Sequence, residues 1–246
     1  MNTTQKSLSG ALVALSLAIP VLAYYWPTKH EPTGWLLTFA IVTAFVVVAG
    51  KYCTNQWRGV LIDKFNLLSL SRFQMVLWTL VILPGWFAIV FHNLAIDGGT
   101  DALNVTIPDQ VFILLGITTV SLVGAPLIKK ERLEKPEPTP TDNQNAASLP
   151  QGKGLLGKAV KNDDPGKANW GDMLKGETAG DFDTLDLAKV QMFLFTLLLA
   201  LGYAFSFAKL FANADGNIDA MPPISEGMSM LLGISNTAYL TNKAVK

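Results

Sequence analysis

LSRFQMVLWTL, at residues 70–80, recurs as LAKVQMFLFTL at residues 187–197. The shorter block LLGIT at 114–118 recurs as LLGIS at 231–235, and both matches lie at one offset of 117 residues. Each recurring block falls within an apolar segment, so the repeated unit holds two such segments. Self-similarity at a fixed offset indicates a duplicated supersecondary unit, here a pair of helices.

Composition and clustering favour a membrane protein. Half of the residues are hydrophobic and 15% are charged, whereas a soluble domain carries about a quarter charged residues. Mean hydropathy is +0.33, and the apolar residues gather in blocks that approach the ~20 residues needed to cross a bilayer. The blocks cover residues 8–26, 35–50, 73–93, 110–128, 188–211 and 226–242. We therefore predict an all-α membrane protein with six transmembrane helices.

Four regions are expected along the chain. They are two N-terminal transmembrane helices (1–56), a first repeat (57–131), a mobile cytoplasmic linker (132–169) and a second repeat (170–246). The linker is predicted because EKPEPTPT at 134–141 is rich in proline and charge. Trp57 and Trp170 open the two repeats, ahead of their helices, and are predicted interfacial anchors, since tryptophan favours the headgroup level.

Basic residues predict the orientation. Lys and Arg occur in residues 51–72, after the fourth apolar segment and at the C-terminal end, but residues 94–108 and 212–223 contain none. Because cytoplasmic loops carry excess Lys and Arg, both termini are predicted to be cytoplasmic and the two-helix repeats to be parallel. The alternative for the first segment is a signal peptide cleaved after Ala23, which leaves the orientation of the other five helices unchanged.

Polar residues inside the apolar segments are the candidate functional positions. Two interpretations are open for them, a polar pore lining and hydrogen bonding or close packing between helices, and the second is favoured because such residues commonly join membrane helices. The residues are Gln74, Thr79, Thr118, Thr119, Ser121, Gln191, Thr196, Ser235, Asn236 and Thr237.

Four ionisable residues are expected at the outer helix ends. His92 and Lys209 occupy equivalent repeat positions, and the lysine is expected to extend to the interface. Asp109 and Glu226 each open a helix, where a carboxylate complements the helix dipole. An acidic ring at an outer mouth is the alternative interpretation of these two acids.

Several classes of protein are disfavoured. The sequence shows no acid/base pair, nucleophilic triad, phosphate loop or metal-ligand spacing, and it contains one cysteine and two histidines. We therefore expect no enzymatic activity, no metal and no cofactor. A net charge of zero argues against a nucleic-acid partner.

Several short blocks carry a resemblance to a known group. They are SLSRFQMVLWT at 69–79, GDMLKGE at 171–177, LDLAKVQM at 185–192 and LGISNTAYL at 232–240. In this order they resemble a recurrent group of uncharacterised bacterial polytopic membrane proteins with a duplicated two-helix FQM…LGI unit. The resemblance covers about residues 57–243. The resemblance implies a bacterial source and a location in the inner membrane. It assigns no activity and no site residue to this chain.

Three functions fit this sequence. The favoured one is an integral inner-membrane scaffold or anchor that recruits a cytoplasmic protein partner through residues 129–186. The alternatives are a homo-oligomeric ion channel or pore lined by the fourth and sixth helices, and a small-solute transporter. The scaffold is favoured because the helices are weakly polar and the cytoplasmic segment is large. Expected partners are membrane lipids and, in a homo-oligomer, further copies of the chain.

Overall fold

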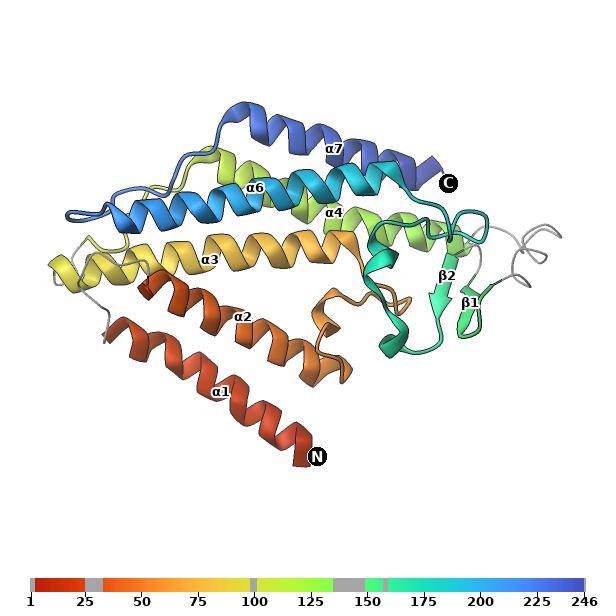
Figure 1. Ribbon diagram of the computed structural model, residues 1–246, viewed down its shortest axis with the longest axis horizontal. Helices are drawn as coiled ribbons and strands as arrows, with labels where there is room; N and C mark the ends of the chain where they lie inside the picture. The colour runs from red at the N-terminus through yellow and green to blue at the C-terminus, as the bar shows by residue number, and fades with distance from the viewer. Residues whose placement is uncertain (1–2, 25–32, 98–100, 135–148, 157–158, 246) are drawn as a thin grey trace. The chain divides into compact units, whose positions relative to one another are not determined.

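The computed structural model describes residues 3–24, 33–97, 101–134, 149–156 and 159–245. Six α-helices lie in these residues, at the six apolar segments expected from the sequence (Figure 1). They are α1 (Thr3–Tyr24), α2 (Thr33–Thr54), α3 (Leu70–Asp97), α4 (Asp109–Glu134), α6 (Leu187–Ala212) and α7 (Glu226–Val245). The prediction of a mostly helical protein is confirmed.

Four of the six helices are long and apolar enough to cross a membrane. The qualifying segments are Thr33–Thr54, Leu70–Ile96, Asp109–Ile128 and Leu187–Ala212. Within the described residues, α1 and α7 do not meet this criterion. Helix α7 carries Asn236, Asn242 and Lys243 among its apolar residues, which lowers its hydropathy. The six spans and the tandem repeat therefore stay predictions.

The repeated helices begin at equivalent positions. Leu70 opens α3 and Leu187 opens α6, 117 residues later; Asp109 opens α4 and Glu226 opens α7 at the same separation. The acidic residues lie in first turns, where they complement the helix dipole. The equal separation is what the sequence repeat predicts.

Side-chain caps fix two of these starts. The Oδ1 atom of Asp186 accepts hydrogen bonds from the backbone N–H groups of Ala188 (3.1 Å) and Lys189 (3.3 Å) at the start of α6. The Oγ atom of Ser225 accepts one from the N–H of Met228 (3.4 Å) at the start of α7. Both caps satisfy backbone donors that have no partner inside the helix.

The chain divides into two compact units, and α3, α4, α6 and α7 each contribute a part to both. The first unit contains Met1–Val60, Val76–Ile113 and Leu198–Ser229, and the second contains Leu61–Met75, Leu114–Leu197 and Met230–Lys246.

An aromatic cluster forms the core of the first unit. The ring of Phe207 stacks on Trp35 with centroids 6.4 Å apart and meets Tyr203 edge-on at 5.0 Å. Trp78 of α3 lies 6.5 Å from Tyr203 and is fully buried. Gly85 allows this packing, because a Cβ atom at that position would overlap the Phe207 ring. Helices α1 and α2 of this unit form an antiparallel pair (Figure 1).

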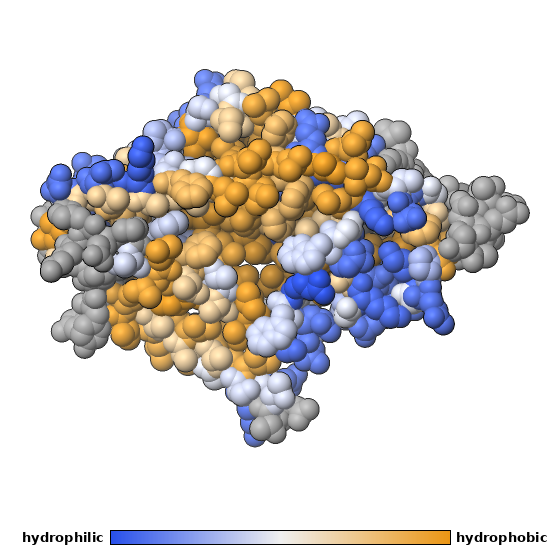
Figure 2. All heavy atoms as spheres, viewed as in Figure 1, coloured by the Kyte–Doolittle hydropathy of each residue, from blue (hydrophilic) through white to orange (hydrophobic). Residues whose placement is uncertain are grey.

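The second unit carries a folded polar segment beside its helices. Strands β1 (Lys153–Leu156) and β2 (Ala159–Asn162) pair antiparallel, with Lys153 opposite Asn162. Two 3-10 turns follow, η2 (Pro165–Lys167) and η3 (Trp170–Met173). We call residues 61–69, 149–156 and 159–186 the cap. Figure 2 shows mainly hydrophilic residues over β1 and β2, in contrast to the hydrophobic surface over the helices.

Hydrogen bonds join the two parts of the cap across a long sequence distance. The side-chain amide of Asn66 donates to the carbonyl oxygen of Asn162, and the Asn162 amide donates to the carbonyl oxygen of Asn66, both at 2.8 Å. The Asp172 carboxylate accepts from the N–H of Leu68 at 3.3 Å. Phe65 is buried beside Ala159 in the cap core.

The cap differs from the extended linker expected over 132–169. Residues 132–134 belong to α4, and residues 149–156 and 159–169 contain β1, β2 and η2. Helix α4 outlasts its apolar block because Lys, Glu, Arg and Leu are all good helix formers. The remaining linker residues, 135–148 and 157–158, lie outside the described residues.

Candidate functional site

Three of the predicted polar residues meet in the second unit. The side-chain amide of Gln74 in α3 donates to the hydroxyl of Thr196 in α6 at 2.8 Å. The hydroxyl of Ser121 in α4 donates to the Gln74 side-chain oxygen at 3.5 Å. All three side chains are fully buried. Hydrogen bonds therefore join three helices inside an apolar bundle, as the packing interpretation predicts.

Two further hydroxyls extend this group toward the cap. The Ser71 Oγ atom lies 3.0 Å from the Ser121 Oγ atom and 3.2 Å from the Tyr239 Oη atom. Tyr239 belongs to α7 and is buried, as is Ser71. We call Ser71, Gln74, Ser121, Thr196 and Tyr239 the polar chain. With Tyr239, the chain includes residues of all four helices of the second unit.

A buried ion group lies next to the polar chain. The Nζ atoms of Lys189 and Lys243 donate to the same carboxylate oxygen, Oε1 of Glu177, at 2.7 and 2.9 Å. The Lys189, Lys243 and Glu177 side chains are 4%, 6% and 11% exposed. The Lys243 Nζ atom also donates to Tyr239 Oη at 3.2 Å, so this group is continuous with the polar chain.

The start of α6 and the end of α7 are joined next to the ion group. The Asn242 amide donates to both carboxylate oxygens of Asp186, each at 2.9 Å. Lys189 also donates to the backbone oxygen of Lys175 at 2.7 Å. Removing one member of a buried ion group costs about 3–5 kcal/mol, because the remaining charge is left uncompensated. The group therefore holds the cap against α6 and α7.

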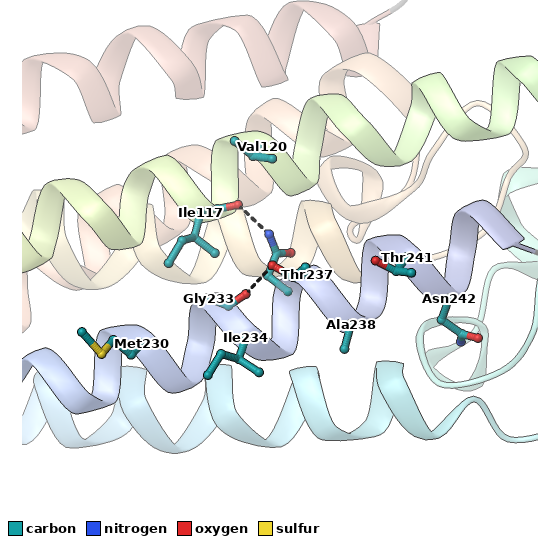
Figure 3. A pocket seen from close by; sticks show the side chains of 10 residues that line it. Ile117, Val120, Met230, Gly233, Ile234, Thr237, Ala238, Thr241 and Asn242 are labelled. Atoms are coloured by element: carbon teal, nitrogen blue, oxygen red, sulfur yellow. Dashed lines mark hydrogen bonds between the residues drawn. The ribbon is translucent and has the colours of Figure 1, made fainter.

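A groove runs along α4 and α7 in the second unit (Figure 3). It has a volume of about 1020 Å³ and a mainly apolar lining. The lining residues include Ile117 and Val120 of α4 and Met230, Gly233 and Ile234 of α7. The groove is thus a lipid-facing surface if these helices span a membrane.

Asn236 is the buried polar residue of the groove. Its Nδ2 atom donates to the backbone oxygen of Ile117 at 3.3 Å. Among the described residues, its Oδ1 atom has no hydrogen-bond partner, and neither does the Oγ atom of the neighbouring Ser235. Within the described residues, these two are the buried members of the predicted polar set that have a side-chain atom without a hydrogen-bond partner.

The other predicted polar residues do not join one lining. Thr119 and Thr237 are exposed, and their hydroxyls donate to backbone oxygens of their own helices, four residues earlier. Thr118 is buried and donates to the backbone oxygen of Leu115. Gln191 is exposed although its repeat equivalent, Gln74, is buried, and Thr79 lies partly buried in the first unit.

The outer-end residues lie in the first unit and have different surroundings. His92 is buried and its Nε2 atom lies 3.0 Å from the backbone oxygen of Gly216. Lys209, Asp109 and Glu226 are exposed. The equivalence of His92 and Lys209 in the repeat is therefore not an equivalence of environment.

Asn93, beside His92, is a site residue that was not singled out from the sequence. Its Nδ2 atom donates to the backbone oxygen of Ile218 at 3.0 Å, and its Oδ1 atom accepts from the Ile218 N–H at 2.8 Å. The side chain thus pairs with the backbone as a neighbouring strand would. It fixes the connection between α6 and α7.

The two predicted anchors are both exposed. Trp57 is 61% exposed in the first unit, and the Lys51 ammonium lies 5.3 Å from its ring centroid. Trp170 is 54% exposed at the start of η3 in the second unit. Exposed tryptophans are what an interfacial position requires.

Some site residues had only weak signals in the sequence. Lys189 is a basic residue within the first turn of an apolar helix, and Lys243 lies four residues after Tyr239, on the same helix face. Neither pattern identifies Glu177 as the shared partner. In the part of the chain that is described, no three His, Cys, Asp or Glu residues group to hold a metal ion.

Comparisons with known proteins add no assignment. No family model, no curated protein and no solved structure matches this chain.

Proposed function

We propose that this chain is an integral membrane scaffold or anchor that recruits a cytoplasmic protein partner through its cap. The observation that carries the proposal is a folded cap with large hydrophobic residues on its surface. Leu156, Trp170 and Leu185 are 46%, 54% and 60% exposed, while the cap core is buried. Exposed aromatic and aliphatic side chains on a polar surface are typical anchors of protein interfaces.

The rigidity of the cap supports this role. The paired amides of Asn66 and Asn162 and the bond from Leu68 to Asp172 hold its segments in one arrangement. A surface ordered before binding avoids the entropy cost of folding on contact with a partner. A partner-binding site is therefore better served by this cap than by an extended linker.

The cellular setting is part of the proposal. We propose a bacterial inner-membrane protein of six spans, with two tandem parallel repeats and both termini in the cytoplasm. The basic residues flanking the apolar segments and the resemblance to bacterial membrane proteins support this setting. A homo-oligomer is proposed because four helices make a thin bundle whose outer face remains available to further copies.

The polar residues favour a scaffold over a pore. Gln74, Ser121 and Thr196 bond to one another, and Gln191, Thr119 and Thr237 are exposed on the helices. A channel through α4 and α7 remains the second candidate because Asn236 Oδ1 lacks a partner among the described residues beside the groove. A small-solute transporter is the third candidate, and parallel repeats argue against it.

Recruitment is tested by changing the cap surface without touching its core. The variant carries Leu156→Ser, Trp170→Ser and Leu185→Ser, and the control carries three exposed membrane-helix changes, Leu194→Ala, Leu198→Ala and Leu201→Ala. Both are expressed in bacterial membranes, and lysine-reactive crosslinking at Lys153, Lys161 and Lys175 is read by mass spectrometry. Crosslinks to one protein, lost only in the cap variant, are expected. Their persistence in the cap variant would contradict recruitment through the cap.

A flux assay separates the alternatives. The purified protein is reconstituted in liposomes, its stoichiometry is determined by mass, and ion release is compared with that of Asn236→Leu. The scaffold predicts no flux from either sample. Ion flux that Asn236→Leu abolishes would establish a channel, and saturable solute uptake would establish a transporter.

A further inference from the structure

The ion group and the polar chain form one continuous hydrogen-bonded path. From Glu177 it passes through Lys243 to Tyr239. From Tyr239 it passes through Ser71 to Ser121, and then reaches the bond between Gln74 and Thr196. Apart from Glu177, which is 11% exposed, every member is buried. The path therefore connects the cap to the interior of the helices.

The bonds of this path have a single consistent direction. The Lys243 ammonium group only donates, so Tyr239 accepts from it and its own proton is available to Ser71. Ser71 then donates to Ser121, and Ser121 donates to the Gln74 carbonyl oxygen. Hydrogen bonds aligned in this way polarise one another, so that loss of one bond weakens the next.

The cap contacts this path through a segment that closes on itself. We call residues 175–186 the strap. The N–H of Gly176 donates to the carbonyl oxygen of Thr184 at 3.1 Å, and Lys175 and Leu185 form an isolated β-bridge. Glu177 lies inside the loop that these two contacts close, so displacement of the strap removes its carboxylate from both lysines together.

We propose that the strap is a latch, held closed by Glu177 on Lys189 and Lys243, and that the polar chain couples its position to the packing of α3, α4 and α6. Opening the strap leaves two buried ammonium groups without their shared carboxylate, which reorients Tyr239 and then Ser71. This inference rests on the proposed scaffold function, for which it supplies regulation. A partner that binds the cap thereby changes the helix bundle.

Coupling is measured by hydrogen exchange on the full chain in detergent micelles. The reporters are the Val160 amide, bonded to the Glu177 carbonyl oxygen at 2.9 Å, and the Gly176 amide. Glu177→Gln tests the latch directly. Gln74→Leu tests the coupling, because Gln74 lies in α3 and bonds to Thr196 and Ser121, at the far end of the path.

We expect both variants to accelerate exchange of the two reporters about fivefold or more, the lower range of measured coupling between sites. The matched control is Thr237→Val, because the one bond of this exposed hydroxyl within the described residues is to its own helix, at Gly233. Exchange in the control is expected to stay within about twofold of the parent protein. Tyr239→Phe breaks the path at its middle without removing a charge, so it is a second test of the coupling and replaces Gln74→Leu if that variant fails to fold.

Two results would overturn the proposal. If Gln74→Leu and Tyr239→Phe leave the reporters at the level of Thr237→Val, the polar chain does not couple to the strap. If Glu177→Gln folds without faster reporter exchange, Glu177 is not the latch. Neither measurement uses a partner. The crosslinking experiment tests recruitment through the cap, so failure of recruitment and failure of the coupling are distinguished.

Discussion

Gly85 and Gly202 occupy equivalent positions of the repeat, 117 residues apart, but only one of them has space for a methyl group. A Cβ atom at Gly85 would overlap the Phe207 ring, whereas at Gly202, apart from the adjoining backbone of its own helix, no atom of the described residues lies within 4 Å of the Cβ position. We predict that Gly85→Ala destabilises the protein and that Gly202→Ala does not.

The magnitude follows from how the Phe207 ring is held. The ring is fully buried, and Trp35 and Tyr203 pack against it, so it cannot move away alone. Overpacking of this kind costs about 1–3 kcal/mol. Alanine gains about 1 kcal/mol of helix propensity over glycine at either position. Since that gain is common to both variants, Gly85→Ala should be less stable than Gly202→Ala by about 1–3 kcal/mol.

The assay is reversible unfolding in mixed detergent micelles, followed by far-UV circular dichroism. A second test repeats Gly85→Ala in a Phe207→Leu background, where the smaller side chain should reduce its cost. Equal stability of the two alanine variants would refute the packing argument. An unchanged cost in the Phe207→Leu background would show that the strain arises elsewhere.

Three further predictions concern single interactions. Asn93→Ala removes two hydrogen bonds to Ile218 and should lower the free energy of unfolding by about 1–3 kcal/mol. Hydrogen exchange at the Ile218 amide should become faster. Unchanged exchange would mean that other contacts hold the connection between α6 and α7. Asn236→Leu removes a buried acceptor that has no partner among the described residues, so the free energy of unfolding in the same assay should be unchanged or raised. A clear loss of stability would contradict this prediction. The Lys175 hydrogen bond holds the pKa of Asp183 below its usual range, so Lys175→Met should raise that pKa toward the ordinary value in a carboxyl NMR titration. A carboxyl group with a lowered pKa in the folded state stabilises that state at pH values above its unfolded pKa, and the stabilisation is lost as the pH falls through the folded pKa. Because Lys175 and Asp183 are both exposed, this contribution is small, so the parent protein and Lys175→Met should have the same stability on both sides of that pH range.

Helix positions were predictable because their signals are local. An apolar block, or an acidic residue at its start such as Asp109 or Glu226, marks a helix within a few residues. The hairpin of β1 and β2 has no comparable signal, because its strands are four residues long and their further bonds run to Asn66 and Glu177. Its stability comes from distant contacts rather than from its own pattern.

The residue types of the candidate site could be predicted from the sequence, but their hydrogen-bond partners could not. The sequence indicates that Gln74 and Gln191 are polar residues in apolar helices, and it gives them nearly identical neighbours. Only tertiary packing decides that Gln74 is buried and bonded to Thr196 while Gln191 is exposed. Likewise, the pairing of Glu177 with Lys243 spans 66 residues, a distance at which no local pattern identifies partners.

The shared carboxylate of Glu177 also orders events during synthesis of the chain. Lys189 follows Glu177 by 12 residues and is made soon after it, whereas Lys243 follows by 66 residues and is made later. A neutral pair is therefore available before α7 is complete. Helix α7, which does not meet the apolar criterion for a span within the described residues, then brings its lysine to a carboxylate already in place. Docking of α7 thus follows formation of the pair between Glu177 and Lys189, and a nascent chain that stops before Lys243 lacks one of the two cations that hold the cap.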